Sequence, residues 1–199
     1  MNQYESETHL AQAMFGHADL GDHRRTRRLV ATFRQMICHP DGTLPYKMAG
    51  PADLKALYRL CDCEAVTHEV LVDAMREYTI RRIEKHDGPV LVVHDATELD
   101  YTTLQSLAEQ LGQIGNGNYR GYVCQNVIAI DPQTGELLGL LDQVLHRRER
   151  VPQGETLTQS RNRESRESLL WLKGAERLPG AAKMIDVCDR GADTFEFFE

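Results

Sequence analysis

The chain has 199 residues, of which 41% are hydrophobic and 27% are charged, and its formal net charge at pH 7 is −7. This composition is typical of a globular protein with a buried core, and the acidic balance argues against a protein that coats nucleic acid indiscriminately. No apolar run approaches membrane-spanning length, and the five cysteines are irregularly spaced. We therefore expect a protein of the cytoplasm that is neither secreted nor inserted in a membrane.

The first half of the chain has a helical pattern. In the segment "LGDHRRTRRLVATFRQMI", which begins at Leu20, Asp22 stands where a helix N-cap is expected. Leu29, Phe33 and Ile37 are spaced by four residues and predict the buried side of this helix. A loop rich in glycine and proline, "CHPDGTLPYKMAGP", follows it.

Two more helices are expected before the pattern changes. In "GPADLKALYRL", Pro51 marks a helix start. Its apolar side is predicted to hold Leu54, Leu57 and Tyr58. The segment "THEVLVDAMREYTIRRIEKH" begins with Thr67 as a cap and ends with basic residues, which suits the helix dipole.

The second half of the chain has the pattern of a sheet. "PVLVVHD", residues 89–95, predicts a buried strand that ends in an acid. "YVCQNVIAI" and "ELLGLLDQVL" predict two strands, and the turn sequence "DPQTG" joins them into an antiparallel hairpin. "ESLLWLKGAERL" predicts a helix, and "AAKMIDVCDRGAD" a further strand that also ends in an acid.

This order of elements predicts an α+β or α/β fold. A small all-helical domain, residues 1–86, precedes a domain with a mixed sheet and helices, residues 87–199.

Two aspartates occupy similar places in the expected sheet. Asp95 follows the apolar run "VLVVH", and Asp189 follows "MIDVC". Ligands of open α/β sheets bind beyond the carboxyl ends of strands, so the two acids are expected to converge there. Close carboxylates repel each other unless a cation keeps both ionised, and Mg²⁺ accepts one or two carboxylates together with waters and phosphate oxygens. For either aspartate alone, a cap or turn residue is the alternative.

Arginines are concentrated at the start of the first of these helices. The run comprises Arg24, Arg25, Arg27 and Arg28. Basic side chains so close together repel one another without an anionic partner, and on a helix they suit phosphates and guanine edges in a major groove. A solvated helix face is the alternative, and we favour DNA. A second basic cluster follows later, in "HRRER" and "RNRESRES".

Several segments, in the same order, resemble transposases of the Tn-five type, in the insertion-sequence-four family. "LGDHRRTRRLV" resembles the Leu-Gly-Asp-x-Arg-Arg-Thr-x-Arg-Leu-Val segment that opens the DNA-binding domain of that family. "ALYRLCDCEAVTHEVL" resembles the Ala-Tyr-Arg-Phe segment that follows it. "VHDATELDY" and "VCDRGAD" resemble the stretches that carry the first and second catalytic aspartates. The resemblance covers nearly the whole chain.

The resemblance implies a DDE transposase with a ribonuclease-H-like core that acts by cut-and-paste DNA transposition. Asp95 and Asp189 match two of its three metal-binding carboxylates, which hold Mg²⁺ or Mn²⁺ for hydrolysis and strand transfer at phosphodiesters. Basic positions that dock on DNA are matched by Arg24, Arg25 and Arg28. The implied partners are double-stranded DNA at the inverted-repeat ends of a transposon and a second transposase subunit, either a copy of this chain or a full-length one. The implied location is the nucleoid of a bacterial cytoplasm.

The third acid of that family is a glutamate in a Tyr-x₂-Arg-x₃-Glu-x₆-Lys signature, which this chain does not contain. Neither Glu196 nor Glu199 is assigned to that role, because both come too early. We expect a truncated transposase that binds transposon ends and cleaves little or no DNA alone, so whether the chain is an enzyme stays open. The alternative is a non-catalytic DNA-binding or inhibitory module derived from a transposase. A metal-dependent phosphohydrolase for small phosphate esters is less favoured.

Overall fold

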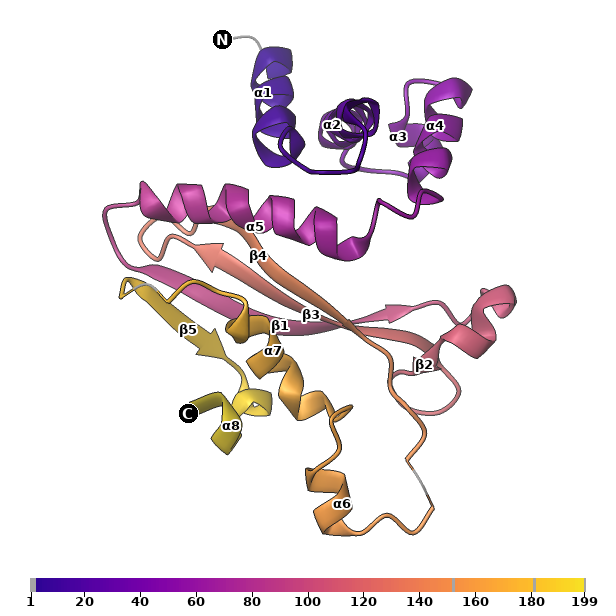
Figure 1. The fold of residues 1–199 in the computed structure, drawn as a ribbon, viewed down its shortest axis with the longest axis vertical. Coiled ribbons are helices and arrows are strands. Elements are labelled where there is room, and N and C mark those ends of the chain that lie inside the picture. The colour runs from indigo at the N-terminus through magenta and orange to yellow at the C-terminus, as the bar shows by residue number, and fades with distance from the viewer. Residues whose placement is uncertain (1–2, 152, 181, 199) are drawn as a thin grey trace. The chain divides into compact units, whose positions relative to one another are not determined.

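The structure is a computed structural model that describes residues 3–151, 153–180 and 182–198; Glu199 lies outside the described residues. N-terminal helices are followed by a mixed sheet with helices, which confirms the predicted α+β fold (Figure 1). The chain forms two compact units, residues 1–81 and 82–199. The assignment of DNA binding to residues 1–86 and of catalysis to residues 87–199 stays a prediction.

The first unit is helical. Its elements are α1 (Gln3–Phe15), α2 (His23–Cys38), α3 (Leu44–Lys47), α4 (Pro51–Cys61) and α5 (His68–Glu84), whose last residues belong to the second unit. The expected helices are present, and the loop expected between the first two contains the short helix α3. Pro51 is at the first position of α4, and the Thr67 hydroxyl accepts a hydrogen bond from the backbone N–H of Val70 at the start of α5.

The core of the first unit joins residues from α1, α2, α4 and α5. Its buried members are Phe15, Ala18, Leu20, Leu29, Leu60 and Ala74. Phe33 packs edge-on against Phe15, with ring centroids 4.7 Å apart. The prediction that Tyr58 lies on the buried side of α4 is wrong, because its side chain is 49% exposed. Leu57 is buried as predicted, Leu60 is buried one helical turn later, and Tyr58 lies off that line.

The second unit is built on a sheet of five strands. These are β1 (Val90–Asp100), β2 (Gly112–Gln113), β3 (Arg120–Ile130), β4 (Leu137–His146) and β5 (Met184–Cys188). The order is β2-β3-β1-β5, and β4 pairs with β3. Strands β3 and β4 form the predicted antiparallel hairpin, β3 is also antiparallel to β1, and β5 is parallel to β1.

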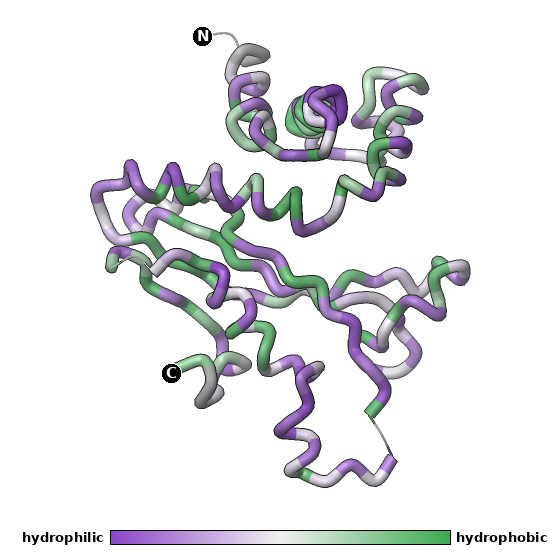
Figure 2. The backbone as a smooth tube through the Cα atoms, in the orientation of Figure 1, coloured by the Kyte–Doolittle hydropathy of each residue, from purple (hydrophilic) through white to green (hydrophobic). Residues whose placement is uncertain are grey.

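Short helices lie between the strands of the second unit and after β5. They are the 3₁₀ segments η1 (Gln105–Gln110), η2 (Glu167–Leu169) and η3 (Arg190–Ala192), and the α-helices α6 (Leu157–Arg161), α7 (Leu170–Glu176) and α8 (Phe195–Phe198). Hydrophobic residues lie along the strands, whereas the segment between β4 and α7 is mainly hydrophilic (Figure 2). Among the described residues, none of the helices has both the length and the apolar character needed to cross a lipid bilayer.

The prediction that the first strand ends at Asp95 is wrong. Strand β1 continues to Asp100, because β3 pairs with it along its whole length, as far as Gly121 opposite Asp100. Asp95 therefore lies in the middle of β1. Its parallel neighbour β5 does end at this level, since Cys188 is aligned with His94.

The two faces of the sheet carry different residues, because side chains alternate along each strand. One face holds Val90, Val92, His94, Val127 and Ala129, all of which are buried. Helix α7 packs on this face against β3 and β4. We call it the α7 face; Asp95 belongs to the opposite face.

Candidate functional site

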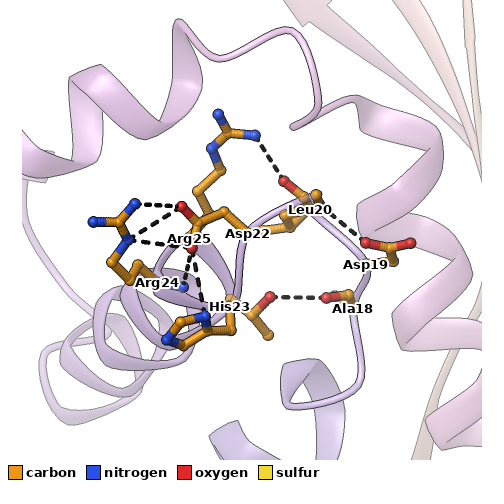
Figure 3. Close-up of polar contacts among 9 residues, drawn as sticks. Ala18, Asp19, Leu20, Asp22, His23, Arg24 and Arg25 are labelled. Atoms are coloured by element: carbon orange, nitrogen blue, oxygen red, sulfur yellow. Dashed lines mark hydrogen bonds and ion pairs between the residues drawn. The ribbon is translucent and has the colours of Figure 1, made fainter.

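Asp22 begins α2 as its N-cap, as the sequence predicts. Its Oδ1 accepts the backbone N–H of Arg24 at 2.9 Å, and its Oδ2 accepts the Arg24 guanidinium, with Nη2 at 2.9 Å (Figure 3). These hydrogen bonds lower the pKa of Asp22 from 3.8 to about 2. The hydrogen bond from the Arg24 side chain has the largest effect, and the one from its backbone N–H has the next largest. The carboxylate and the guanidinium are therefore both charged at neutral pH.

The turn before α2 is tied to the first turn of the helix. Gly21 has a φ of 71°, a conformation that favours glycine. The guanidinium of Arg25 donates to the carbonyl of Leu20 at 2.9 Å, and the Thr26 hydroxyl donates to the carbonyl of Ala18 at 2.9 Å (Figure 3 shows the first of these). The Leu-Gly-Asp-x-Arg-Arg-Thr pattern thus has a structural role in addition to its charge.

Arg28 reaches from α2 to α4. Its Nη1 donates to Oδ1 of Asp53 at 2.7 Å, and the two side chains are 41% and 32% exposed. Arg24, Arg25 and Arg28 thus each have an acceptor within the chain. The expectation that the arginine run needs an external anion to relieve its repulsion is wrong for these three residues, because Asp22, Asp53 and a backbone carbonyl partly compensate them.

The three arginines nevertheless line one cavity of about 590 Å³. Its lining is Asp22, Arg24, Arg25, Arg28, Ala56, Arg59, Leu60 and Cys63. Four arginines and one aspartate are therefore among the residues that line it. We call this the arginine cavity. Guanidinium groups bind phosphate oxygens in a planar, bidentate manner, so the lining suits a phosphate-bearing ligand.

Arg59 is the residue that sequence reasoning missed. It belongs to the last turn of α4 and lines the arginine cavity. The segment "ALYRL" contains it, but only the packing of α4 beside α2 brings it to the arginines of α2. Arg27, in contrast, lines a different cavity of about 280 Å³, together with His23 and Thr26.

Two arginines of the second basic cluster are paired with carboxylates within the second unit. Arg148 contacts Glu98 at 3.0 Å and also pairs with Glu167, and hydrogen bonds to these two carboxylates raise its pKa. Arg163 pairs with Glu155. These two arginines of the cluster are therefore engaged by carboxylates of the second unit.

Asp95 and Asp189 lie at neighbouring positions of parallel strands. His94 and Cys188 are aligned in β1 and β5, and each aspartate is the next residue of its chain segment. Neighbouring strands are about 4.8 Å apart, so the two carboxylates start from adjacent backbone positions. Asp189 has an extended backbone, with φ −80° and ψ −177°, so by alternation both side chains belong to the face opposite α7.

Asp189 is also a cap, the alternative considered from the sequence. It is the N-cap of η3, and its Oδ1 accepts the backbone N–H of Gly191 at 2.8 Å. Asp95 is exposed and is aligned with Asn126 of β3. Burial and the charges of Asp186 and Asp189 raise the pKa of the intervening Cys188 to about 11, so its thiol is protonated at neutral pH.

The donor chemistry fits a hard divalent cation. Mg²⁺ is commonly held by one or two carboxylates while waters and substrate phosphates complete its octahedron, and Asp95 and Asp189 can supply that number. Within the part of the chain that the structure describes, no group of three or more histidine, cysteine, aspartate or glutamate side chains is placed to hold a metal ion.

A comparison with protein families matches residues 7–66 to a model described as transposase DNA-binding. The matched range runs from α1 to the residues just before α5 and includes every residue of the arginine cavity. The match supports the presence of a transposase N-terminal domain in this chain.

Proposed function

We propose that the chain is a transposase polypeptide of the bacterial cytoplasm whose first unit binds the inverted-repeat ends of a transposon. One observation carries the proposal: four arginines from two helices meet in one cavity, and this cavity lies wholly within the range matched to transposase DNA-binding domains. Duplex DNA presents closely spaced phosphates, which such a group of guanidinium ions can contact without reading a base.

The internal partners of the arginines shape this interaction. Asp22 and Asp53 pair with Arg24 and Arg28 and so reduce the charge that these two arginines offer to a phosphate. Both pairs are at least partly exposed, which keeps their own stabilisation small. A phosphate oxygen can then bind the guanidinium beside the carboxylate or in its place.

Binding to labelled duplexes at several salt concentrations tests the proposal. We expect the affinity to fall steeply between about 50 and 200 mM salt, and each of Arg24→Ala and Arg59→Ala to reduce the salt slope by about one. Arg150→Ala, an exposed arginine of the second unit, is the matched control and should leave the slope unchanged. Equal losses with Arg150→Ala, or no salt dependence, would contradict a DNA site in the arginine cavity.

Specificity requires a second comparison, because phosphate contacts alone carry no sequence information. The parent protein should bind a duplex that contains the inverted repeat flanking its coding region more tightly than a shuffled duplex of equal length. Equal affinity for both duplexes at every salt concentration would restrict the function to general DNA binding.

For the second unit, the proposal assigns Asp95 and Asp189 to the metal-dependent chemistry of a DDE-type core. The places of Asp95 in β1 and of Asp189 directly after β5, each next to the aligned pair His94 and Cys188, support this role. Bound Mg²⁺ or Mn²⁺ would polarise the phosphodiester and lower the pKa of a water. The chain's own contribution is to hold Asp95 on β1 and Asp189 in the turn directly after β5, where the Gly191 N–H donates to one oxygen of Asp189. No residue of this chain is assigned as the third acid, so we expect little strand cleavage by this chain alone.

Mn²⁺ binding, measured by electron paramagnetic resonance, tests this assignment without requiring turnover. Asp95→Asn and Asp189→Asn should each weaken binding by about tenfold or more. Asp87→Asn, which removes an exposed acid in the turn before β1, is the charge-matched control. If all three variants bind Mn²⁺ like the parent, the two aspartates are not the metal ligands.

A non-catalytic role is the second candidate. It is favoured by the contrast between a cavity with four arginines and a donor set of only two assigned carboxylates. A DNA-binding or subunit-pairing module of this kind would compete with a full-length transposase. Addition of the chain to an active transposition reaction should then lower its rate, and an unchanged rate at saturating concentration would exclude inhibition.

A further inference from the structure

Strand β5 is attached to the sheet by a short parallel contact. Only five residue pairs, from Val90–Met184 to His94–Cys188, align it with β1. Its outward residues Ile185 and Val187 are 50% and 40% exposed. A short strand with half-exposed side chains is weakly held in register by hydrophobic contacts, so polar contacts such as those of Lys183 with Val90 and His86 help to specify its alignment.

A histidine–aspartate pair crosses from β1 to β5 at this place. Nε2 of His94 lies 2.8 Å from Oδ1 of Asp186. An ionised carboxylate can only accept, so Nε2 carries the hydrogen and donates it. Asp186 is aligned with Val92, two residues before His94, so the contact is a diagonal one on the α7 face.

The imidazole of His94 is packed on its other sides, and its Nδ1 has no hydrogen-bond partner among the described residues. Its side chain is fully buried, and the ring of Phe197 meets it edge-on with centroids 5.8 Å apart. Helix α7 approaches closely, because a Cβ added at Gly174 would lie 2.8 Å from Val127 and 3.7 Å from Nδ1 of His94. The histidine is thus a fixed point on β1 to which β5 is tethered through Asp186, whose side chain is 49% exposed.

We infer that His94 and Asp186 are positioning residues that set the register of β5 and thereby place Asp189 beside Asp95. The inference rests on the proposed function, in which these two aspartates act together. A slip of one residue would turn Asp189 to the α7 face, and a slip of two would move it by about 6.6 Å along the strand. A polar contact between the buried imidazole of His94 and the half-exposed carboxylate of Asp186 can select one register, because a slipped strand would leave the imidazole without this partner.

Disulfide formation between the two aspartate positions reads out the register without any metal. Adjacent strand positions about 4.8 Å apart lie within the Cα separation of a disulfide. We combine Asp95→Cys with Asp189→Cys in a Cys188→Ala background, oxidise mildly, and identify the linked peptides by mass spectrometry. The single Asp95→Cys variant shows any linkage to the remaining native cysteines.

We expect the cross-link to form readily, to form about tenfold more slowly with Asp186→Ala, and to recover with Asp186→Asn, whose amide oxygen still accepts from Nε2. His94→Leu, which keeps an apolar side chain in the core, should slow it similarly. Cross-linking at the rate of the parent double-cysteine protein in both the Asp186→Ala and the His94→Leu variants would overturn the inference. Asp87→Ala is the matched surface control and should have no effect.

The same experiment separates this inference from the proposed catalytic role. A cross-link that depends on Asp186, in a protein whose parent form binds no Mn²⁺, would support the register device and count against the metal assignment. No cross-link in the parent double variant would overturn both, because the two positions would then not be adjacent. Mn²⁺ affinity that falls with Asp186→Ala and returns with Asp186→Asn would support both.

Discussion

Asp95 and Asp189, far apart in the sequence, each directly follow a member of the aligned pair His94 and Cys188 in parallel strands. This relationship brings two carboxylates to adjacent backbone positions on one face of the sheet. Strand β1 continues past this point and β5 does not, so β1 presents Asp95 from a rigid strand while Asp189 caps the turn that follows β5.

The ion pair at the start of α2 predicts a specific dependence of stability on pH. The folded pKa of Asp22 is lowered to about 2, so its stabilising contribution is present above its ordinary pKa of 3.8 and is lost as the pH falls through about 2. Asp22→Asn keeps a capping side chain but no charge. We expect its melting temperature, measured by circular dichroism, to lie below that of the parent above about pH 4 and to approach it near pH 2. A constant difference across this range would show that the charge is not involved.

The partner of Arg28 limits the charge that the arginine cavity offers to DNA. Asp53→Asn removes the carboxylate 2.7 Å from Arg28 and leaves the side-chain size unchanged. We expect DNA affinity at low salt to rise by about fivefold or less, because an exposed ion pair contributes little free energy of its own. Asp41→Asn, in the exposed loop before α3, is the control. A fall in affinity would mean that Asp53 chiefly orients Arg28 for the phosphate.

The turn that holds Asp189 is packed against the single tryptophan of the chain. A Cβ at Gly191 would lie 2.5 Å from Cζ2 and Cη2 of Trp171 and 2.9 Å from Oδ1 of Asp189. Gly191→Ala should therefore destabilise the protein by about 1–3 kcal/mol and change the tryptophan emission. Trp171→Phe removes the obstructing ring, so the double variant should lose less stability than the sum of the two single variants in urea unfolding. Full additivity would contradict a direct contact.

Close approach of β1 and β3 makes a second glycine sensitive. A Cβ at Gly121 would lie 1.8 Å from the backbone oxygen of Leu99, which cannot move without separating the strands. We expect Gly121→Ala to lower the free energy of unfolding by about 3 kcal/mol. Gly180→Ala, where nothing lies within 4 Å, should change it by about 0.5 kcal/mol or less. Similar small losses at both positions would indicate that this end of β1 is not tightly paired.

The helices and the hairpin were predictable because their determinants are local. Asp22 and Thr67 carry capping oxygens at helix starts, and Pro51 fits the first turn of a helix. The side chain of Asp131 accepts hydrogen bonds from Gln133 and Thr134 in the turn between β3 and β4. Each of these contacts joins residues within three positions of each other, so the sequence alone contains both partners and their spacing.

The true length of β1 was not predictable, because its second half is polar and exposed. Residues 96–100 fall outside the predicted strand, which ended at Asp95, yet β3 supplies a continuous hydrogen-bonding neighbour for them. The same holds for Arg59, whose neighbours across the cavity come from another helix.

The sequence by itself determined the α+β class, the arginine run and the two aspartates that end apolar runs. Only the tertiary structure decided that Arg28 is paired with Asp53, that Arg59 joins the arginine cavity, and that His94 tethers Asp186 beside the aspartates. The physical reason is the range of the interactions. Periodicity, capping and turn propensities act between neighbours in the chain, whereas ion pairs across helices and register between parallel strands depend on which distant segments pack together.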